Sequence, residues 1–123
     1  MILDNLYWKF GVMKYKTTQE FNKAWKEYTS MLAPELNLDP DKQATEFSEI
    51  LVEYSADWKE ENNELQIKIK SQYDQPLKMG EILYELNTQG HDFFQDADFS
   101  YFQGLEEDDL EEEVPVFKMM MSD

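Results

Sequence analysis

The densest group of chemically active residues is a run of seven carboxylates at positions 106–113, interrupted only by Leu110. Carboxylates held this close raise the local negative potential, which accelerates encounter with a cationic protein surface. The same pattern is also typical of a solvated loop. Because the whole chain is acidic, we expect the run to dock a basic partner, with contacts from Glu107, Asp108, Asp109, Glu111 and Glu112.

The charge of the chain narrows the choice of partner. Its 123 residues hold 27 Asp and Glu against 11 lysines and no arginine, for a net charge of -16. That charge repels a polyanion, so direct binding to nucleic acid is not expected. We expect a basic protein, such as a toxin or another nucleic-acid-acting enzyme, with Trp58, Tyr101 and Phe102 as aromatic anchors.

His91 is the one histidine, and Asp92, Asp96 and Asp98 follow it closely. An imidazole beside carboxylates can bind a divalent metal or act as a general base. A zinc site would need further spaced ligands, and there is no second histidine to supply one. We therefore expect His91 to have a structural role at a helix end, and we expect no metal or cofactor.

A calcium-loop template also fits part of this region. Its ligand positions 1, 3, 5, 7, 9 and 12 would fall on Asp96, Asp98, Ser100, Phe102, Gly104 and Glu107. The sharp turn at position 6 needs glycine, where this chain has Tyr101. Residues 99–105 alternate as a strand does, so calcium binding is not expected. No nucleophile elbow, phosphate loop or dinucleotide fingerprint occurs either, which favours a non-catalytic protein.

Two helices are indicated on either side of a strand region. Thr17 and Glu20 form a capping box ahead of apolar residues at three–four spacing, and Pro34 should end that helix. Another helix should start at Pro76 and end before Gly90. Asp39 and Pro40 predict a third, shorter helix, whose inward residues would be Ala44 and Phe47.

Alternation predicts the strands. Apolar residues at alternate positions of 50–58 and of 65–69 predict an antiparallel hairpin, with acids on its first strand facing lysines on its second. Two more strands should span Phe99–Leu105 and Val114–Met121, joined by the acidic run. Pro115 indicates that the last strand begins there or lies at an edge, with alternate residues of Met119–Met121 facing inward. Residues 1–16 favour an extended segment.

These elements predict one acidic α+β domain over residues 1–123. Its antiparallel sheet of about four strands would carry two to three helices on one face. An unpaired edge strand leaves the protein a monomer or a homodimer. No apolar run approaches the ~20 residues of a membrane span, and the N-terminus lacks the order of a signal peptide, so we expect a cytoplasmic protein without membrane contact.

The C-terminal third carries three short aromatic motifs, Gly90-His91-Asp92-Phe93-Phe94, Tyr101-Phe102-Gln103-Gly104-Leu105 and Val114-Pro115-Val116-Phe117. Through these motifs the chain resembles small bacterial immunity proteins, which neutralise a toxin by binding it. The resemblance implies a cytoplasmic inhibitor without catalysis. The alternatives are a DNA mimic that blocks a nucleic-acid-binding protein, a small metal-dependent hydrolase using His91 and Asp92 or Asp98, and an adaptor whose acidity serves solubility.

Overall fold

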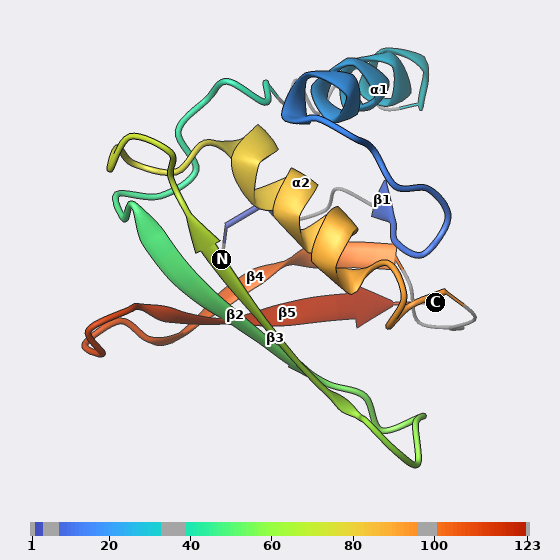
Figure 1. Ribbon diagram of the computed structural model, residues 1–123, viewed down its shortest axis with the longest axis vertical. Helices are drawn as coiled ribbons and strands as arrows, with labels where there is room; N and C mark the ends of the chain where they lie inside the picture. Colours follow the sequence, from blue (N-terminus) through green and yellow to red (C-terminus); the bar gives the residue numbers. More distant parts are fainter. Residues whose placement is uncertain (1, 4–7, 33–38, 96–100, 123) are drawn as a thin grey trace.

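The computed structural model describes residues 2–3, 8–32, 39–95 and 101–122. They form an α+β domain with two helices and one five-stranded sheet (Figure 1). This confirms the predicted fold class. The elements in chain order are β1 Trp8–Lys9, α1 Thr18–Leu32, β2 Glu49–Ser55, β3 Glu64–Lys70, α2 Met79–Gly90, β4 Tyr101–Asp109 and β5 Val116–Ser122.

The sheet is mixed rather than wholly antiparallel. Its strand order is β1-β4-β5-β2-β3, and β5 runs parallel to β2 while every other neighbouring pair is antiparallel. The last strand is therefore central. Of the two alternatives that Pro115 predicted, a strand start at this position is confirmed and an edge position is wrong. Strand β5 thus offers no edge for dimerisation. Pro115 stands just before β5, and its carbonyl accepts a hydrogen bond from the Leu51 amide at 2.9 Å.

The β2–β3 hairpin is confirmed, with Ile50 opposite Ile69 and Val52 opposite Ile67 on the buried face. On its other face only Glu49 meets a lysine, Lys70. Lys68 faces Leu51, and Glu53 faces Gln66. The predicted pairing of acids with lysines across the hairpin is thus limited to one pair, because the register offsets the remaining charges.

Both long helices form, but the predicted start of the second helix at Pro76 is wrong. The Glu20 amide donates to the Thr17 hydroxyl at 3.1 Å at the start of α1. Helix α2 starts at Met79, three residues after Pro76, and the Glu81 carboxylate accepts from the Lys78 amide at 3.0 Å. Gly90 is the last residue of α2 rather than the residue beyond it.

The short helix expected after Asp39 and Pro40 is absent from residues 39–48, so that prediction is wrong. Backbone groups there bond to the segment before α2 instead. The Ala44 amide donates to the Leu77 carbonyl, and the Leu77 amide donates to the Phe47 carbonyl, both at 2.9 Å. These long-range bonds replace the local ones that a helix would make. Pro34 and Phe99 lie outside the described residues.

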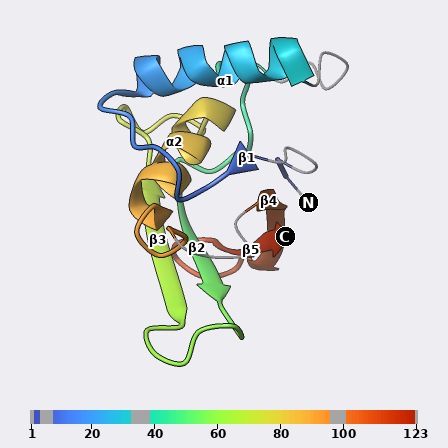
Figure 2. The ribbon, with the colours of Figure 1, turned by 90° about the vertical axis from the view of Figure 1, so that its right-hand side faces the viewer.

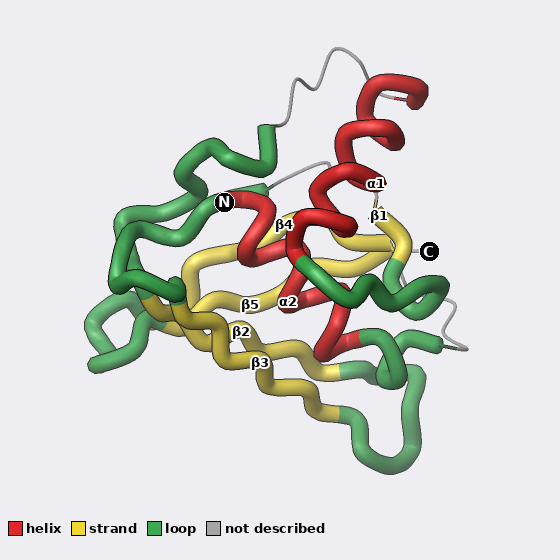
Figure 3. Tube along the Cα trace, turned by 45° about the horizontal axis from the view of Figure 1, so that its top comes forward, coloured by secondary structure: helices red, strands yellow, loops and turns green. Residues whose placement is uncertain are grey.

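The two helices lie on one face of the sheet, with α2 against the strands and α1 beyond α2 (Figure 2). The opposite face carries no helix (Figure 3). At the N-terminal side, Trp8 of β1 contacts Phe21, Trp25 and Tyr28 of α1, each at a ring-centroid distance of 5.3 Å. These contacts attach α1 to the edge of the sheet.

In the described part of residues 1–16, the predicted extended segment is limited to the strand Trp8–Lys9 and one bridge, and residues 11–12 form a bend. Trp8 and Lys9 pair with Phe102 and Tyr101, and Ile2 forms a bridge with Leu105. Within the described parts of the chain, no helix is long and apolar enough to cross a membrane.

A buried polar contact between Trp8 and Asn87 gives a test of this arrangement. The Trp8 indole Nε1 donates to Asn87 Oδ1 at 3.1 Å, and Asn87 Nδ2 donates to the Met13 carbonyl at 2.9 Å. Asn87→Ala leaves both partners unpaired, and we expect the free energy of unfolding in urea to fall by about 1–3 kcal/mol. Gln72→Ala, at an exposed position, is the control. Equal midpoints for both variants would contradict this role for Asn87.

Candidate functional site

The acidic run is half strand and half turn. Strand β4 continues through Asp109, so the first four acids belong to a formed hairpin rather than to the predicted loop. Within it, Glu106 pairs with Lys118 and Glu107 pairs with Phe117 of β5. We call residues 106–113 the acidic hairpin. Its first four carboxylates belong to a ladder, which fixes their spacing more firmly than a loop would.

The strand geometry spreads these charges over both faces. Paired residues project to the same side of a sheet, so Glu106 lies on the helix-free face and Glu107 on the other. A register shift between Glu107 and Asp109 makes Asp108 the extra residue of a bulge. At the turn, the Glu111 amide donates to Asp109 Oδ1 at 3.1 Å. All seven acids are exposed.

Little positive charge lies close to these carboxylates. Among the described residues, the one ion pair within the acidic hairpin joins Asp108 Oδ1 to Lys118 Nζ at 4.0 Å. Lys118 also lies opposite Glu106 on β4 and opposite Glu53 on β2. Lys118 thus forms an ion pair with one carboxylate and lies opposite two others. Leu110 is 36% exposed within the run and gives the acidic hairpin an apolar side chain at its turn.

Charge is divided unevenly along the chain. Residues 8–17, which include β1, hold three of the 11 lysines and none of the 27 acids. Helix α1 holds two lysines and two acids, and α2 holds two acids and no lysine, so the excess of lysine lies in β1 and the segment before α1. The surplus of acids belongs to the rest of the chain. The sequence analysis missed this division, although counting charges segment by segment would have revealed it.

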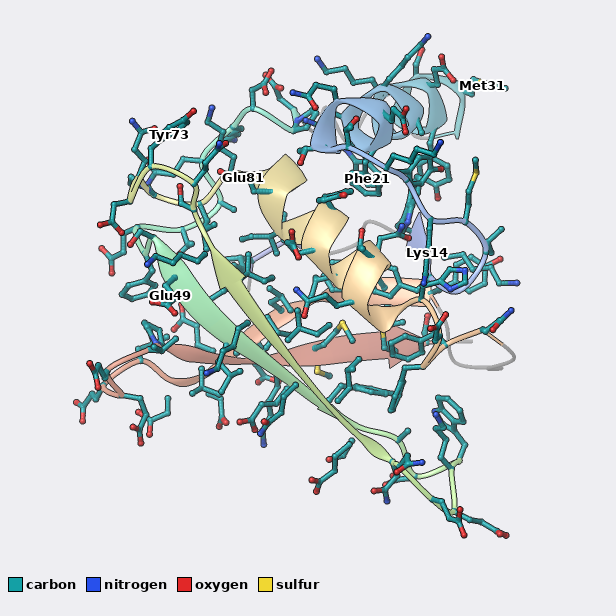
Figure 4. The ribbon with its side chains drawn as sticks, viewed as in Figure 1. Lys14, Phe21, Met31, Glu49, Tyr73 and Glu81 are labelled. Carbon is teal, nitrogen blue, oxygen red and sulfur yellow. The ribbon has the colours of Figure 1, made fainter. Side chains whose placement is uncertain are left out.

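A second group of acids lies at the opposite end of β2. The β2–β3 turn and its flanks carry Asp57, Glu60, Glu61 and Glu64, all exposed. Because β2 and β5 are parallel, this turn and the acidic hairpin lie at opposite ends of the two strands (Figure 1). Glu49, at the start of β2, lies at the same end as the acidic hairpin (Figure 4).

The predicted aromatic anchors are not gathered beside the acids. Tyr101 is 37% exposed but lies at the far end of β4 from Asp109, roughly 25 Å away for a strand of this length. Phe102 is fully buried and packs against Phe10, so it belongs to the core and its predicted role in partner contact is wrong. The acids and the predicted aromatic anchors are therefore separated along the sheet.

Trp58 is half-buried after β2. Its ring contacts Phe93 and Phe94 at centroid distances of 6.0 and 6.3 Å, and its Nε1 donates to the Tyr54 hydroxyl at 3.4 Å. Lys59 lies over the Phe93 ring at 3.9 Å. These contacts fasten the β2–β3 turn to the segment after α2, which leaves only part of the Trp58 side chain available to a partner.

His91 follows α2 as its C-terminal cap residue. Its Nδ1 lies 2.8 Å from Asp92 Oδ1, and Lys14 Nζ lies 3.5 Å from the same oxygen. The hydrogen bond from His91, and then the charge of Lys14, lower the pKa of Asp92 below its ordinary value. The described residues include no group of three His, Cys, Asp or Glu side chains that could hold a metal.

The remaining ligands considered for a metal, Asp96, Asp98 and Ser100, lie outside the described residues. Phe102 and Gly104 of the calcium template belong to β4, so this part of the template is strand, as the alternation predicted.

Comparisons with protein-family models, with curated proteins and with solved structures find no match to the chain.

The environment of Asp92 predicts a pH dependence. Because its pKa is lowered on folding, Asp92 favours the folded state above its unfolded pKa, and this contribution is lost as pH falls through the folded pKa. In a carboxyl-carbon NMR titration, we expect Lys14→Ala to raise the Asp92 midpoint toward its ordinary value. Lys23→Ala is the control and should leave it unchanged. An Asp92 titration midpoint that is unchanged in Lys14→Ala would contradict the role of Lys14 in lowering the pKa of Asp92.

Proposed function

We propose that this protein is a non-catalytic inhibitor that covers a basic surface on a protein partner, namely the active-site groove of a nuclease-type toxin. The observation that carries the proposal is the acidic hairpin, in which seven carboxylates are exposed and, among the described residues, only Asp108 has an ion-pair partner. A nuclease groove is lined with cations because it binds phosphates. The resemblance to bacterial immunity proteins favours the same class of function.

Binding would combine long-range attraction with a small apolar contact. Carboxylates on a formed hairpin lose little conformational entropy on binding. Their summed potential steers a cationic partner toward that end of the sheet. Leu110 would then supply apolar contact inside a charged rim, which is the usual arrangement of a protein interface. On this proposal Glu107, Asp108, Asp109, Glu111 and Glu112 make the charged contacts.

A DNA mimic is the second candidate, and the second acidic turn is the observation that favours it. Glu49 and Glu53 of β2 lie between the acidic hairpin and the acids of the β2–β3 turn. Such a row could follow an extended DNA-binding surface, whereas the inhibitor proposed above needs only the acidic hairpin.

The test begins with capture of the partner from the source cell at low ionic strength, followed by salt elution and mass spectrometry. We expect a strongly basic protein. Association is then measured by stopped flow for a variant with Glu107, Asp109 and Glu111 changed to Lys. The rate constant should fall about tenfold or more at low salt, and its salt dependence should weaken, because the reversed charges repel the partner.

A variant with Asp57, Glu60 and Glu61 changed to Lys is the matched control, since it alters net charge equally at the opposite end. An inhibitor that docks through the acidic hairpin predicts a much smaller effect for this control. Equal losses in both variants would favour the DNA mimic. Unchanged association in the hairpin variant would remove the acidic hairpin from the binding surface.

A further inference from the structure

The pairing between β2 and β5 is short, and the two strands separate beyond it. Their ladder covers three residue pairs and ends at Glu53 and Lys118. Strand β2 continues to Ser55 and β5 continues to Ser122, and these ends diverge (Figure 1). The space of ≈ 340 Å³ beside the diverging ends, which we call the β2–β5 cleft, is lined by Glu53, Tyr54, Ser55, Lys118, Met119, Met120 and Met121.

Three methionines form one wall of the cleft. Met119 is buried, Met121 is half-buried and Met120 is 41% exposed on the helix-free face. Met120 lies opposite Gly104, which has no side chain to cover it. Tyr101, paired with Ser122, adds a second exposed apolar side chain at this end of the face. Thioether side chains repack easily around a ligand, and an exposed apolar patch often marks a binding surface.

The backbone at the cleft is available for strand pairing. Beyond Lys118, β5 pairs with β4 alone, and beyond Glu53, β2 pairs with β3 alone. The sides of the two strands that face the cleft therefore have no ladder partner. An extended chain can supply main-chain partners to such an edge while its alternate side chains enter a pocket.

The charge around the cleft favours a basic ligand. Glu53 lines it, and Glu64 of β3 lies opposite Ser55, which also lines it. Its lysine, Lys118, is already paired with Asp108.

We propose that the β2–β5 cleft receives an extended segment of a protein partner in which apolar side chains alternate with lysine or arginine. The apolar side chains would contact the methionines, and the cations would face Glu53 and Glu64. The proposal rests on the proposed function in that the partner is basic, but it concerns a separate part of the surface.

Methionine-methyl NMR tests this on the full chain. The probe is a short peptide alternating Lys and Leu, and the control peptide alternates Lys and Ser, with the same charge. We expect the Lys–Leu peptide to shift the methyl signals of Met119, Met120 and Met121, and the Lys–Ser peptide to shift them far less. Met13 and Met31, which are 57% and 79% exposed, are internal references that should not move.

Two matched variants locate the site. Met120→Lys should weaken binding of the Lys–Leu peptide about tenfold, since it replaces an apolar contact with a repelling charge. Met31→Lys makes the same change on α1 and should leave the affinity unchanged. Equal shifts at Met13 and Met31, or full affinity in Met120→Lys, would overturn the proposal. So would cleft signals that move with protein concentration alone, because a second copy would then be the occupant.

The outcome is separable from that of the proposed function. If the cleft methionines respond to the peptide while reversal of the acidic hairpin leaves partner association unchanged, the cleft proposal stands and the hairpin proposal fails. If charge reversal in the acidic hairpin slows partner association but the cleft methionines do not respond to the peptide, the hairpin proposal stands and the cleft proposal fails.

Discussion

The structure depends on the parallel pairing of β2 with β5. Three residue pairs, from Leu51 with Val116 to Glu53 with Lys118, join the β2–β3 hairpin to the strands β5, β4 and β1. The direction of this pairing places the two acidic turns at opposite ends of the sheet, and its shortness leaves the β2–β5 cleft open. A longer ladder would close the cleft and bring Met120 beside Ser55, so the proposed peptide site exists because the pairing stops early.

Local patterns predicted the elements well, and long-range pairing limited the prediction. Alternation at 50–58 and 65–69 identified the hairpin because both strands have one buried face. The parallel partner of β2 lies more than 60 residues away, and no local signal in Leu51–Glu53 specifies it. Asp39 and Pro40 are good helix-starting residues, yet hydrogen bonds to Leu77 determine that segment. Capping signals describe only what a segment does without its neighbours.

The candidate site was predicted as a segment but not as a surface. The acids of 106–113 were visible in the sequence, whereas the extension of β4 through half of them depends on pairing with β5. Tyr101 and Phe102 are adjacent, so in a strand only one can face solvent, and the sequence alone does not say which. The methionine run was predicted as a strand segment with alternate side chains facing inward. Its position beside an opening in the sheet could follow only from the strand order.

The uneven division of charge along the chain gives the molecule a permanent electric dipole in addition to its net charge. Residues 8–17 hold three lysines and no acid, and Lys14 lies on the opposite side of the molecule from Glu49 and the acidic hairpin (Figure 4). In the field of an approaching polycation, such a dipole exerts a torque that turns the acidic hairpin forward and Lys14 backward. The protein would thus be oriented before collision, which reduces the rotational search.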